Sequence, residues 1–309
     1  MLIDWHAHHT PVELAERIGG LGQRTPKLDA EDSPDFAKRV REMDASGIDL
    51  QIVSQGAGLN ADGLPPEVAI ELVRVSNDLV AERSAPYADR VAGSVAVTYQ
   101  DVTGSVDEIE RNAGRGFAAV MLYANGPLIG QAEVEPLFAK IHEAKLPIFL
   151  HGGGAGVSRP PGLDALEDNG MGVVVSATSD AAVSDCVVRM IAAGLFDRYP
   201  GLRIVIRSGG GGVPLLQSKL WWKHKSPGGA ERQYVDILRD HFLIDTASVT
   251  PRGLAGLVLI MGEDRIVFGS DYCGGLGPLS KAMPVLDEQD DPAAMRAMVE
   301  RNAQALFGK

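Results

Sequence analysis

The sequence predicts an α/β fold, specifically a (β/α)₈ barrel with long loops after its first and fifth strands. Eight short β-branched, apolar runs follow one another along the chain, each of a length typical of a strand buried on both faces. Helical patterns separate these runs in strict alternation. Such alternation fits either a closed parallel barrel or a doubly wound open sheet, and the count of eight units favours the barrel.

The predicted strands share a core of Val, Ile, Leu or Phe and are bounded by turn residues. They cover residues 2–8, 48–55, 91–98, 117–123, 147–153, 203–210, 242–248 and 265–272.

The helices between the strands have recognisable starts and apolar faces. Ser33 precedes Pro34, which predicts a capping residue followed by a proline at the first helical position. Phe36, Val40 and Met43 then recur at spacings of four and three, which gives one apolar face. Similar patterns predict helices over 133–145, 181–199 and 291–307.

Two long stretches, 10–31 and 154–180, are rich in Gly and Pro and poor in helical periodicity. In a barrel both would be βα loops on the face where catalytic residues gather, so we expect them to cover a substrate. No linker or low-complexity segment divides the chain, and residues 1–309 are therefore predicted to form one domain.

Composition narrows the class of function. The chain has 309 residues, a net charge of −12 and two cysteines, Cys186 and Cys273. An acidic protein offers no broad basic surface for nucleic acid, and two cysteines cannot form a disulfide framework. Without a signal peptide or a membrane-spanning run, the expected localisation is cytoplasmic.

Four potential metal ligands stand at the ends of three predicted strands. His6 and His8 are two residues apart on the first strand, so both side chains point the same way, into the barrel mouth. His151 ends the fifth strand and Asp271 ends the eighth, which adjoins the first strand in a closed barrel. Three imidazoles and one carboxylate predict a single divalent metal, with Zn²⁺ favoured and Mn²⁺ or Fe²⁺ as alternatives.

In these residues and their surroundings, the chain resembles the amidohydrolase-related family, in the branch that includes aminocarboxymuconate-semialdehyde, resorcylate and carboxyvanillate decarboxylases. The resemblance runs the whole length, through IDWHAH at the start, Asn77-Asp78, PIFLHGG, LFDRYPGLRIVI, GGGGVP, MGEDRIVFGSDY and Asn302-Ala303. It implies a barrel, one metal, usually a dimer, and most often nonoxidative decarboxylation.

The chain departs from that family at the end of the sixth strand, where the family's catalytic histidine is replaced by Ser208. Serine is no general base without a partner. Asp271 could combine metal binding with base catalysis. Alternatively, Arg207 or His224 could take the place of the missing histidine. The third alternative is a metal-binding subunit that is catalytically altered within a hetero-oligomer.

Three further residues are candidates for contact with the substrate. Arg207 and Lys219 could bind a carboxylate, and Tyr123 at the end of the fourth strand could donate a hydrogen bond or pack in the barrel. The fourth strand has no lysine to bridge two metals, so a binuclear site is not expected.

The sequence is compatible with three functions, and none of them involves binding to nucleic acid or to a membrane. The first is a metal-dependent lyase acting on a small unsaturated or aromatic carboxylic acid, with Asp271 and Ser208 as candidate catalytic residues. The second is a hydrolase in which metal-bound water attacks an amide or lactone with Asp271 as base. The third is the altered subunit. A homodimer, or a hetero-oligomer with a homologue, is the expected assembly.

Overall fold

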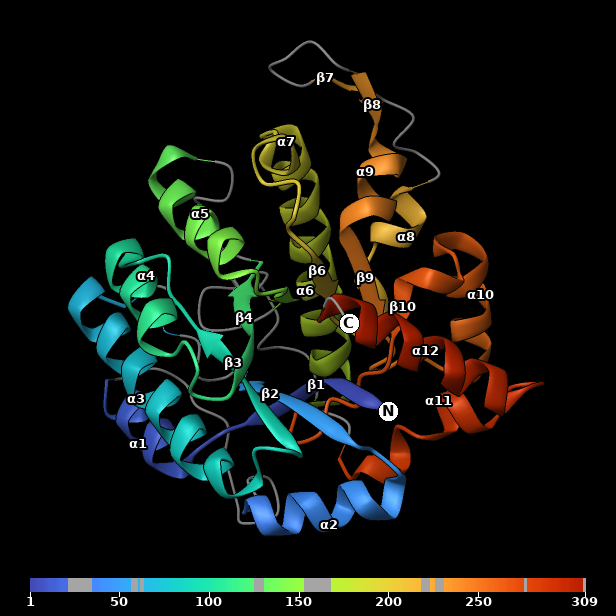
Figure 1. The fold of residues 1–309 in the computed structure, drawn as a ribbon, viewed down its shortest axis with the longest axis horizontal. Coiled ribbons are helices and arrows are strands. Elements are labelled where there is room, and N and C mark those ends of the chain that lie inside the picture. Colours follow the sequence, from blue (N-terminus) through green and yellow to red (C-terminus); the bar gives the residue numbers. More distant parts are fainter. Residues whose placement is uncertain are drawn as a thin grey trace.

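The computed structural model describes residues 1–21, 35–56, 61, 64–124, 131–152, 168–217, 223–225, 231–274 and 277–307, with the backbone alone at 168–175 and 224. Eight parallel strands form one curled sheet in the order β1-β2-β3-β4-β5-β6-β9-β10. Helices surround this sheet, as Figure 1 shows. The predicted α/β fold with eight parallel strands is therefore confirmed, and its curvature is consistent with a (β/α)₈ barrel.

The eight strands follow the predicted order and begin near the predicted residues. They are β1 Ile3–His9, β2 Leu50–Gln55, β3 Val91–Ala96, β4 Phe117–Tyr123, β5 Ile148–His151, β6 Ile204–Ile206, β9 Phe242–Asp245 and β10 Ile266–Val267. A two-stranded antiparallel hairpin that the sequence did not suggest, β7 Lys223–Lys225 with β8 Glu231–Gln233, projects from the sheet (Figure 1).

The first strand and the segment after the last strand lie side by side. The amide of Trp5 donates to the carbonyl of Phe268 at 2.9 Å, and that of His8 donates to Tyr272 at 2.8 Å. Ala7 also forms a parallel bridge with Tyr272. Residues from the two ends of the chain are thus joined at the mouth of the sheet.

The helices lie outside the sheet and supply apolar faces to its core. They are α1 Val12–Gly20, α2 Phe36–Ser46, α3 Pro66–Ser84, α4 Val102–Arg111, α5 Glu135–Ala144, α6 Asp168–Ala192, α7 Leu195–Arg198, α8 Val213–Leu216, α9 Tyr234–His241, α10 Pro251–Met261, α11 Pro284–Asp287 and α12 Pro292–Leu306.

The predictions for the two long stretches were partly wrong. The first contains α1, whose Leu14, Ala15 and Ile18 are buried, and the second contains the start of α6. Only three of the nine residues of α1 are buried, so its apolar periodicity is short and easily missed.

The start of α2 also differs from the prediction. The helix begins at Phe36, and the side chain of Asp35 caps it by accepting a hydrogen bond from the amide of Lys38 at 2.6 Å. Ser33 and Pro34, the predicted cap, lie outside the described residues. Asp35 is as good an N-cap as serine, which explains why the prediction fell two residues early.

Several strands end earlier than predicted, and in β6 and β10 a turn of the backbone accounts for it. Ser208 and Asp271 have φ of 51° and 55°, in the left-handed region, so neither continues a strand. They stand instead in turns just beyond β6 and β10.

A β-bulge interrupts β1 between Asp4 and Ala7. Before it, Ile3 and Trp5 belong to the cluster inside the sheet, with Met121, Phe149 and Val205. An extra residue reverses the alternation of side chains. His6 therefore packs its ring against Phe149, with ring centroids 4.9 Å apart.

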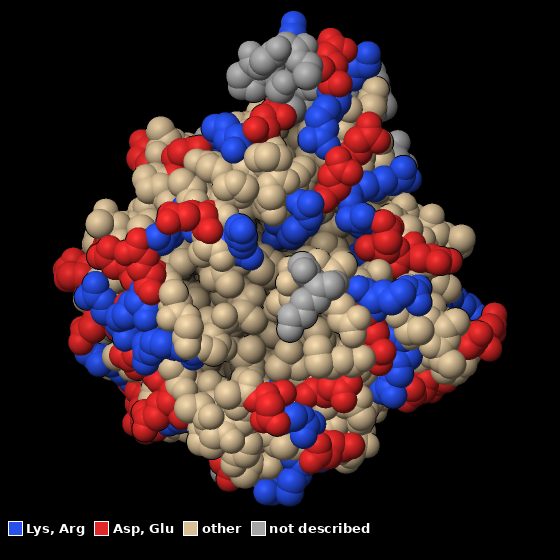
Figure 2. Space-filling model, in the orientation of Figure 1, with Lys and Arg blue, Asp and Glu red and all other residues tan. Residues whose placement is uncertain are grey.

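The molecular surface carries charges of both signs. Acidic and basic side chains are interspersed over the face in Figure 2. Among the described residues, no helix has the length and apolarity needed to cross a bilayer.

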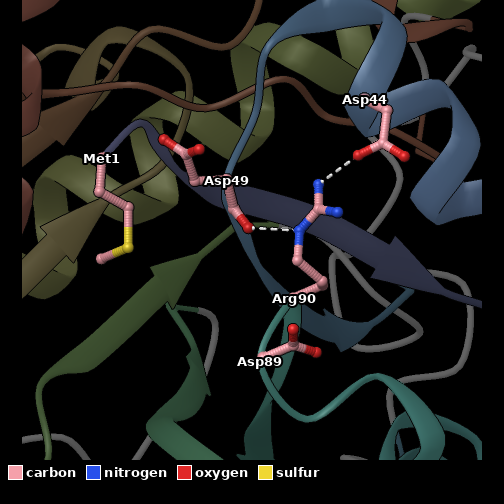
Figure 3. Close-up of a pocket in the computed structure, with 5 residues that line it drawn as sticks. All are labelled: Met1, Asp44, Asp49, Asp89 and Arg90. Atoms are coloured by element: carbon pink, nitrogen blue, oxygen red, sulfur yellow. Dashed lines mark hydrogen bonds and ion pairs between the residues drawn. The ribbon is translucent and has the colours of Figure 1, made fainter.

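A pocket of about 650 Å³ lies where β1, β2 and β3 begin, lined by Met1, Asp44, Asp49, Asp89 and Arg90 (Figure 3). Arg90 pairs with Asp44 at 2.7 Å and donates to the backbone carbonyl of Asp49 at 2.8 Å. This is the opposite end of the strands from His8 and His151, so the pocket does not contain the candidate metal centre.

Candidate metal centre

The end of the sheet where the strands finish brings the predicted ligands together. His6 and His8 occupy the second half of β1, and His151 is the last residue of β5. One ring nitrogen from each lies within 4.8 Å of the others, an arrangement that could hold a metal ion. All three imidazoles are buried.

Asp271 reaches the same point from the turn after β10. Its Oδ1 atom lies 3.3 Å from Nε2 of His6 and 3.2 Å from Nε2 of His8. The two Nε2 atoms are themselves 3.1 Å apart. Three atoms with lone pairs therefore form a nearly equilateral triangle, hereafter the ligand triangle.

The other ring nitrogens of the two histidines of β1 are held by acceptors. Nδ1 of His6 lies 2.8 Å from a carboxylate oxygen of Asp245. Nδ1 of His8 lies 3.2 Å from the carbonyl oxygen of Gln55 and 3.1 Å from the hydroxyl of Ser54, which itself can donate to the carbonyl of Ala7. These acceptors place a proton on each Nδ1. With that proton on Nδ1, each Nε2 can offer its lone pair to a metal ion at the ligand triangle, which is the usual arrangement of metal-binding histidine.

The third imidazole, His151, is held mainly by ring packing. Its ring stands nearly perpendicular to those of His6 and His8, at 5.2 and 5.1 Å between centroids. Its Nδ1 is buried and has no hydrogen-bond partner among the described residues. A buried ring nitrogen without a partner costs free energy unless a ligand satisfies it.

The electrostatics of the centre favour a bound cation. Burial disfavours the charged form of His6, but Asp245 and Asp271 raise its pKa to about 10. Burial also opposes ionisation of Asp271, yet its contacts with His6 and His8 hold its pKa far below the usual range. Burial, with His8, His6 and Arg207 nearby, lowers the pKa of His151 well below the ordinary value.

The residues present fit a divalent metal. Ligands about 2.0–2.2 Å from one ion lie roughly 3 to 3.5 Å apart in tetrahedral or octahedral geometry. The edges of the ligand triangle, 3.1 to 3.3 Å, match that range. The donor set of imidazole and carboxylate suits Zn²⁺, Mn²⁺ or Fe²⁺.

Ser208 and Arg207 lie beside this centre, in the turn after β6. The hydroxyl of Ser208 accepts a hydrogen bond from Nη1 of Arg207 at 3.2 Å, and Nη2 of Arg207 donates to Asp180 at 3.0 Å. A guanidinium cannot take up a proton at neutral pH. Among the described residues, Ser208 therefore has no base to activate it.

Of the remaining residues predicted to contact the substrate, the structure describes the side chain of Tyr123. The hydroxyl of Tyr123 donates to the carbonyl of Gly56 at 3.2 Å, and its ring lies 6.0 Å from that of His151. Lys219 and the side chain of His224 lie outside the described residues.

Two buried side chains that the sequence analysis overlooked support the centre. Asp245 holds His6, and Arg39 donates to the carbonyl of His8 at 2.6 Å while its guanidinium lies 4.9 Å from the ring of Tyr272. A signal existed for each. Asp245 is the first polar residue after the apolar run of its strand, and Arg39 lies on the apolar face of its helix with Phe36 and Met43.

Comparison with known proteins agrees with this geometry. Residues 3–309 match the family model described as Amidohydrolase, and the chain belongs to that family. It is 28% identical over 258 residues to the gamma-resorcylate decarboxylase of Rhodococcus jostii (strain RHA1), covering 76% of each chain.

Solved structures of similar proteins share the fold. The 5-carboxyvanillate decarboxylase of Sphingomonas paucimobilis superposes with a TM-score of 0.78 at 25% identity, covering 99% of this chain and 98% of the other. The dihydroxybenzoic acid decarboxylase of Polaromonas sp. JS666, solved with manganese and 2-nitroresorcinol, gives 0.81 at 24% identity, covering 99% and 96%. Resorcylate and carboxyvanillate decarboxylases belong to the branch that the sequence resembles, so that resemblance is confirmed.

Proposed function

We propose that this chain is a metal-dependent lyase that decarboxylates a small aromatic or unsaturated carboxylic acid. The observation that carries the proposal is the ligand triangle, where three potential metal-binding atoms converge within 3.3 Å at the end of the sheet. The decarboxylases among its relatives supply the reaction class. A closed barrel formed by one domain over 1–309, assembling as a homodimer or with a homologue, completes the proposal.

One divalent ion would be held by His6, His8, His151 and Asp271. Zn²⁺ remains our prediction, with Mn²⁺ or Fe²⁺ as alternatives. The manganese bound in the Polaromonas relative supports Mn²⁺. Such an ion, when bound, stabilises negative charge that develops on a substrate oxygen, as a Lewis acid.

Arg207 is the proposed anchor for the negative charge of the substrate. Its guanidinium is mostly buried and is oriented by Asp180 and Ser208. A fork of N–H donors matches a carboxylate or phenolate oxygen, and burial strengthens such charged hydrogen bonds. Lys219 and Tyr123 are kept as secondary candidates for substrate contact.

Asp271 is the proposed carrier of the proton. In a decarboxylation the bond to the carboxyl carbon breaks, CO₂ leaves, and the electron pair stays on the substrate carbon, which then takes up a proton. The side chain of Asp271 is 16% exposed at the end of the sheet, where it can accept a proton from a substrate hydroxyl and pass it to that carbon. Ser208 remains a candidate only for a hydrogen bond to the substrate.

Release of CO₂ from a panel of hydroxybenzoates and muconates by the metal-loaded protein tests this function. We expect CO₂ from at least one compound, abolished by a chelator and restored by a divalent metal. Hydrolysis of amides or lactones without any CO₂ would favour the second function, in which Asp271 is the base of a hydrolase. Protein that binds metal but turns over substrate only with a copurified homologue would favour the altered subunit.

A further inference from the structure

Asp245 has no role in the predicted ligand set, yet it is the closest carboxylate to Nδ1 of His6. It ends β9, its residue is 0% exposed, and no ion pair with Lys or Arg is recorded for it among the described residues. A buried carboxylate needs several hydrogen bonds to offset its lost hydration. The hydrogen-bond partners of Asp245 therefore indicate its role.

The two oxygens of Asp245 have different partners. Oδ2 accepts the Nδ1 proton of His6 at 2.8 Å. Oδ1 accepts two backbone amides, from Ser208 at 2.7 Å and Ala247 at 2.9 Å. The carboxylate thus joins a predicted metal ligand on β1 to the turn after β6 and the turn after β9.

Gly269 packs closely against both His6 and Asp245. A Cβ atom at Gly269 would lie 2.8 Å from Cβ of His6 and 2.9 Å from Cβ of Asp245. Any larger residue at Gly269 would push the two side chains apart. The close approach of Asp245 to His6 is therefore built into the sequence of both strands and of the segment after β10.

We propose that Asp245 is a positioning residue that fixes the tautomer and orientation of His6 for metal binding. This inference rests on the proposed metal site. Because a carboxylate only accepts hydrogen bonds, Asp245 keeps the proton of His6 on Nδ1 and leaves the Nε2 lone pair for the ion. Its other oxygen is held by two backbone amides, which fix the carboxylate, and rotation of the His6 ring would break the hydrogen bond from Nδ1 to Oδ2.

The change Asp245→Asn separates these roles with almost no change in volume. An amide has only one oxygen, and two backbone N–H groups already face the Oδ1 position. The oxygen would stay there, and the NH₂ group would face Nδ1 of His6. Nδ1 must then accept, the proton of the ring moves to Nε2, and that atom can no longer bind a metal.

We would measure the Zn²⁺ dissociation constant of purified protein by competition with a chromophoric chelator at fixed pH. Removing such a partner of a metal-bound histidine typically weakens metal binding about 10- to 100-fold, and we expect that loss in Asp245→Asn. Glu108→Gln, which makes the same carboxylate-to-amide change at a buried residue of α4, is the matched control and should leave Zn²⁺ affinity unchanged.

A second measurement does not depend on a variant that folds. The chain has seven histidines, so ¹⁵N-histidine spectra of the Zn²⁺-loaded wild-type protein are simple. His6 should carry its proton on Nδ1, shifted further downfield than the Nδ1 proton of His8, whose partner is a neutral carbonyl.

The outcomes separate this inference from the proposed function. Wild-type affinity for Zn²⁺ in a folded Asp245→Asn protein would overturn the role of Asp245, and so would a proton on Nε2 of His6 in the spectra. Failure of the wild-type protein itself to bind a divalent metal would instead refute the proposed function.

Discussion

Two buried polar clusters of this protein differ in how their charges are matched. One is the ligand triangle at the mouth of the sheet, with His6, His8 and Asp271. The other surrounds Glu108 on α4, against α3. Each contains a side chain almost free of solvent, with exposures of 2% or less for His8 and Glu108. Their hydrogen-bond partners point to opposite uses.

In the α4 cluster every strong acceptor meets a donor. Arg111 binds both oxygens of Glu108 at 2.7 Å, and Asn77 adds a bond at 3.0 Å. Asn77 also exchanges two hydrogen bonds with the backbone of Ala96 in β3. This cluster is complete, so it ties α3, α4 and β3 together and needs no ligand.

At the mouth, three potential metal ligands face one another. The two Nε2 atoms and Oδ1 of Asp271 converge within 3.3 Å. The fold holds this arrangement through Asp245, Gln55 and Arg39, which direct the histidines from behind. A buried cluster in which every charge is paired stabilises a fold, whereas converging imidazole and carboxylate groups are arranged to bind a cation.

Loss of a member of the ligand triangle should have the largest effect. In His6→Ala and Asp271→Ala, we expect bound metal to fall far below one ion per chain and turnover to drop at least about 100-fold, beyond the usual effect of losing a supporting partner. Elemental analysis of untreated protein and CO₂ release check both. Stoichiometric metal in either variant would contradict the assignment.

Arg207→Met should have the next largest effect, because it removes the proposed anchor but no ligand. Losing a hydrogen bond to a charged group costs about 1.5–3 kcal/mol, so kcat/KM should fall by roughly 10- to 100-fold with metal content intact. Arg203→Met is the control, since Arg203 bonds only to nearby backbone carbonyls. Equal kinetics for the two variants would remove Arg207 from the substrate site.

Glu108→Gln should show the reverse pattern. Its free energy of unfolding should drop by about 1–3 kcal/mol, because Arg111 loses a charged, two-pronged partner within a buried cluster. Metal content and kcat should stay at the wild-type level. Urea unfolding measures the loss, and Glu110→Gln, which changes an exposed neighbour, should be nearly neutral. A loss of metal in Glu108→Gln would break the distinction between the two clusters.

The smallest effect concerns pH. Burial alone would raise the pKa of Glu108, but hydrogen bonds from Arg111 and Asn77 and the nearby positive charges lower it below the ordinary value of 4.5. A carboxyl whose pKa is lower in the folded state stabilises the fold above its unfolded pKa and loses that contribution as pH falls. The stability gap between wild type and Glu108→Gln should therefore be full near pH 7 and shrink below about pH 4.5. A gap that is constant down to pH 3 would disprove this.

The sequence predicted the strand order and the meeting of His6, His8, His151 and Asp271, because strand ends in a parallel sheet share one edge. Strict alternation along the whole of β1 would have misled, since it groups Ile3 and Trp5 with Ala7 rather than with His6 and His8. The bulge that corrects this leaves no local signal. The left-handed turns at Ser208 and Asp271 were missed because their neighbours are compatible with an extended strand.

Asp245 and Arg39 could not be assigned from sequence for another reason. Their roles depend on contacts with His6 and His8 across more than thirty positions of chain, 239 for Asp245 and 31 for Arg39. A carboxylate at a strand end and an arginine on a helix are each common. Only the folded structure shows that both residues contact the histidines of β1.

The two ends of the chain meet at the metal centre, and this has a consequence during synthesis. His6 and Ser270, the neighbour of Asp271, are 264 positions apart. At translation rates of about 5–20 residues per second, roughly 13–50 s separate the emergence of the first ligands from that of the last. Throughout that interval the nascent chain carries two histidines without their carboxylate. Tight metal capture should therefore be a late event in the biogenesis of this protein, after Asp271 has emerged from the ribosome.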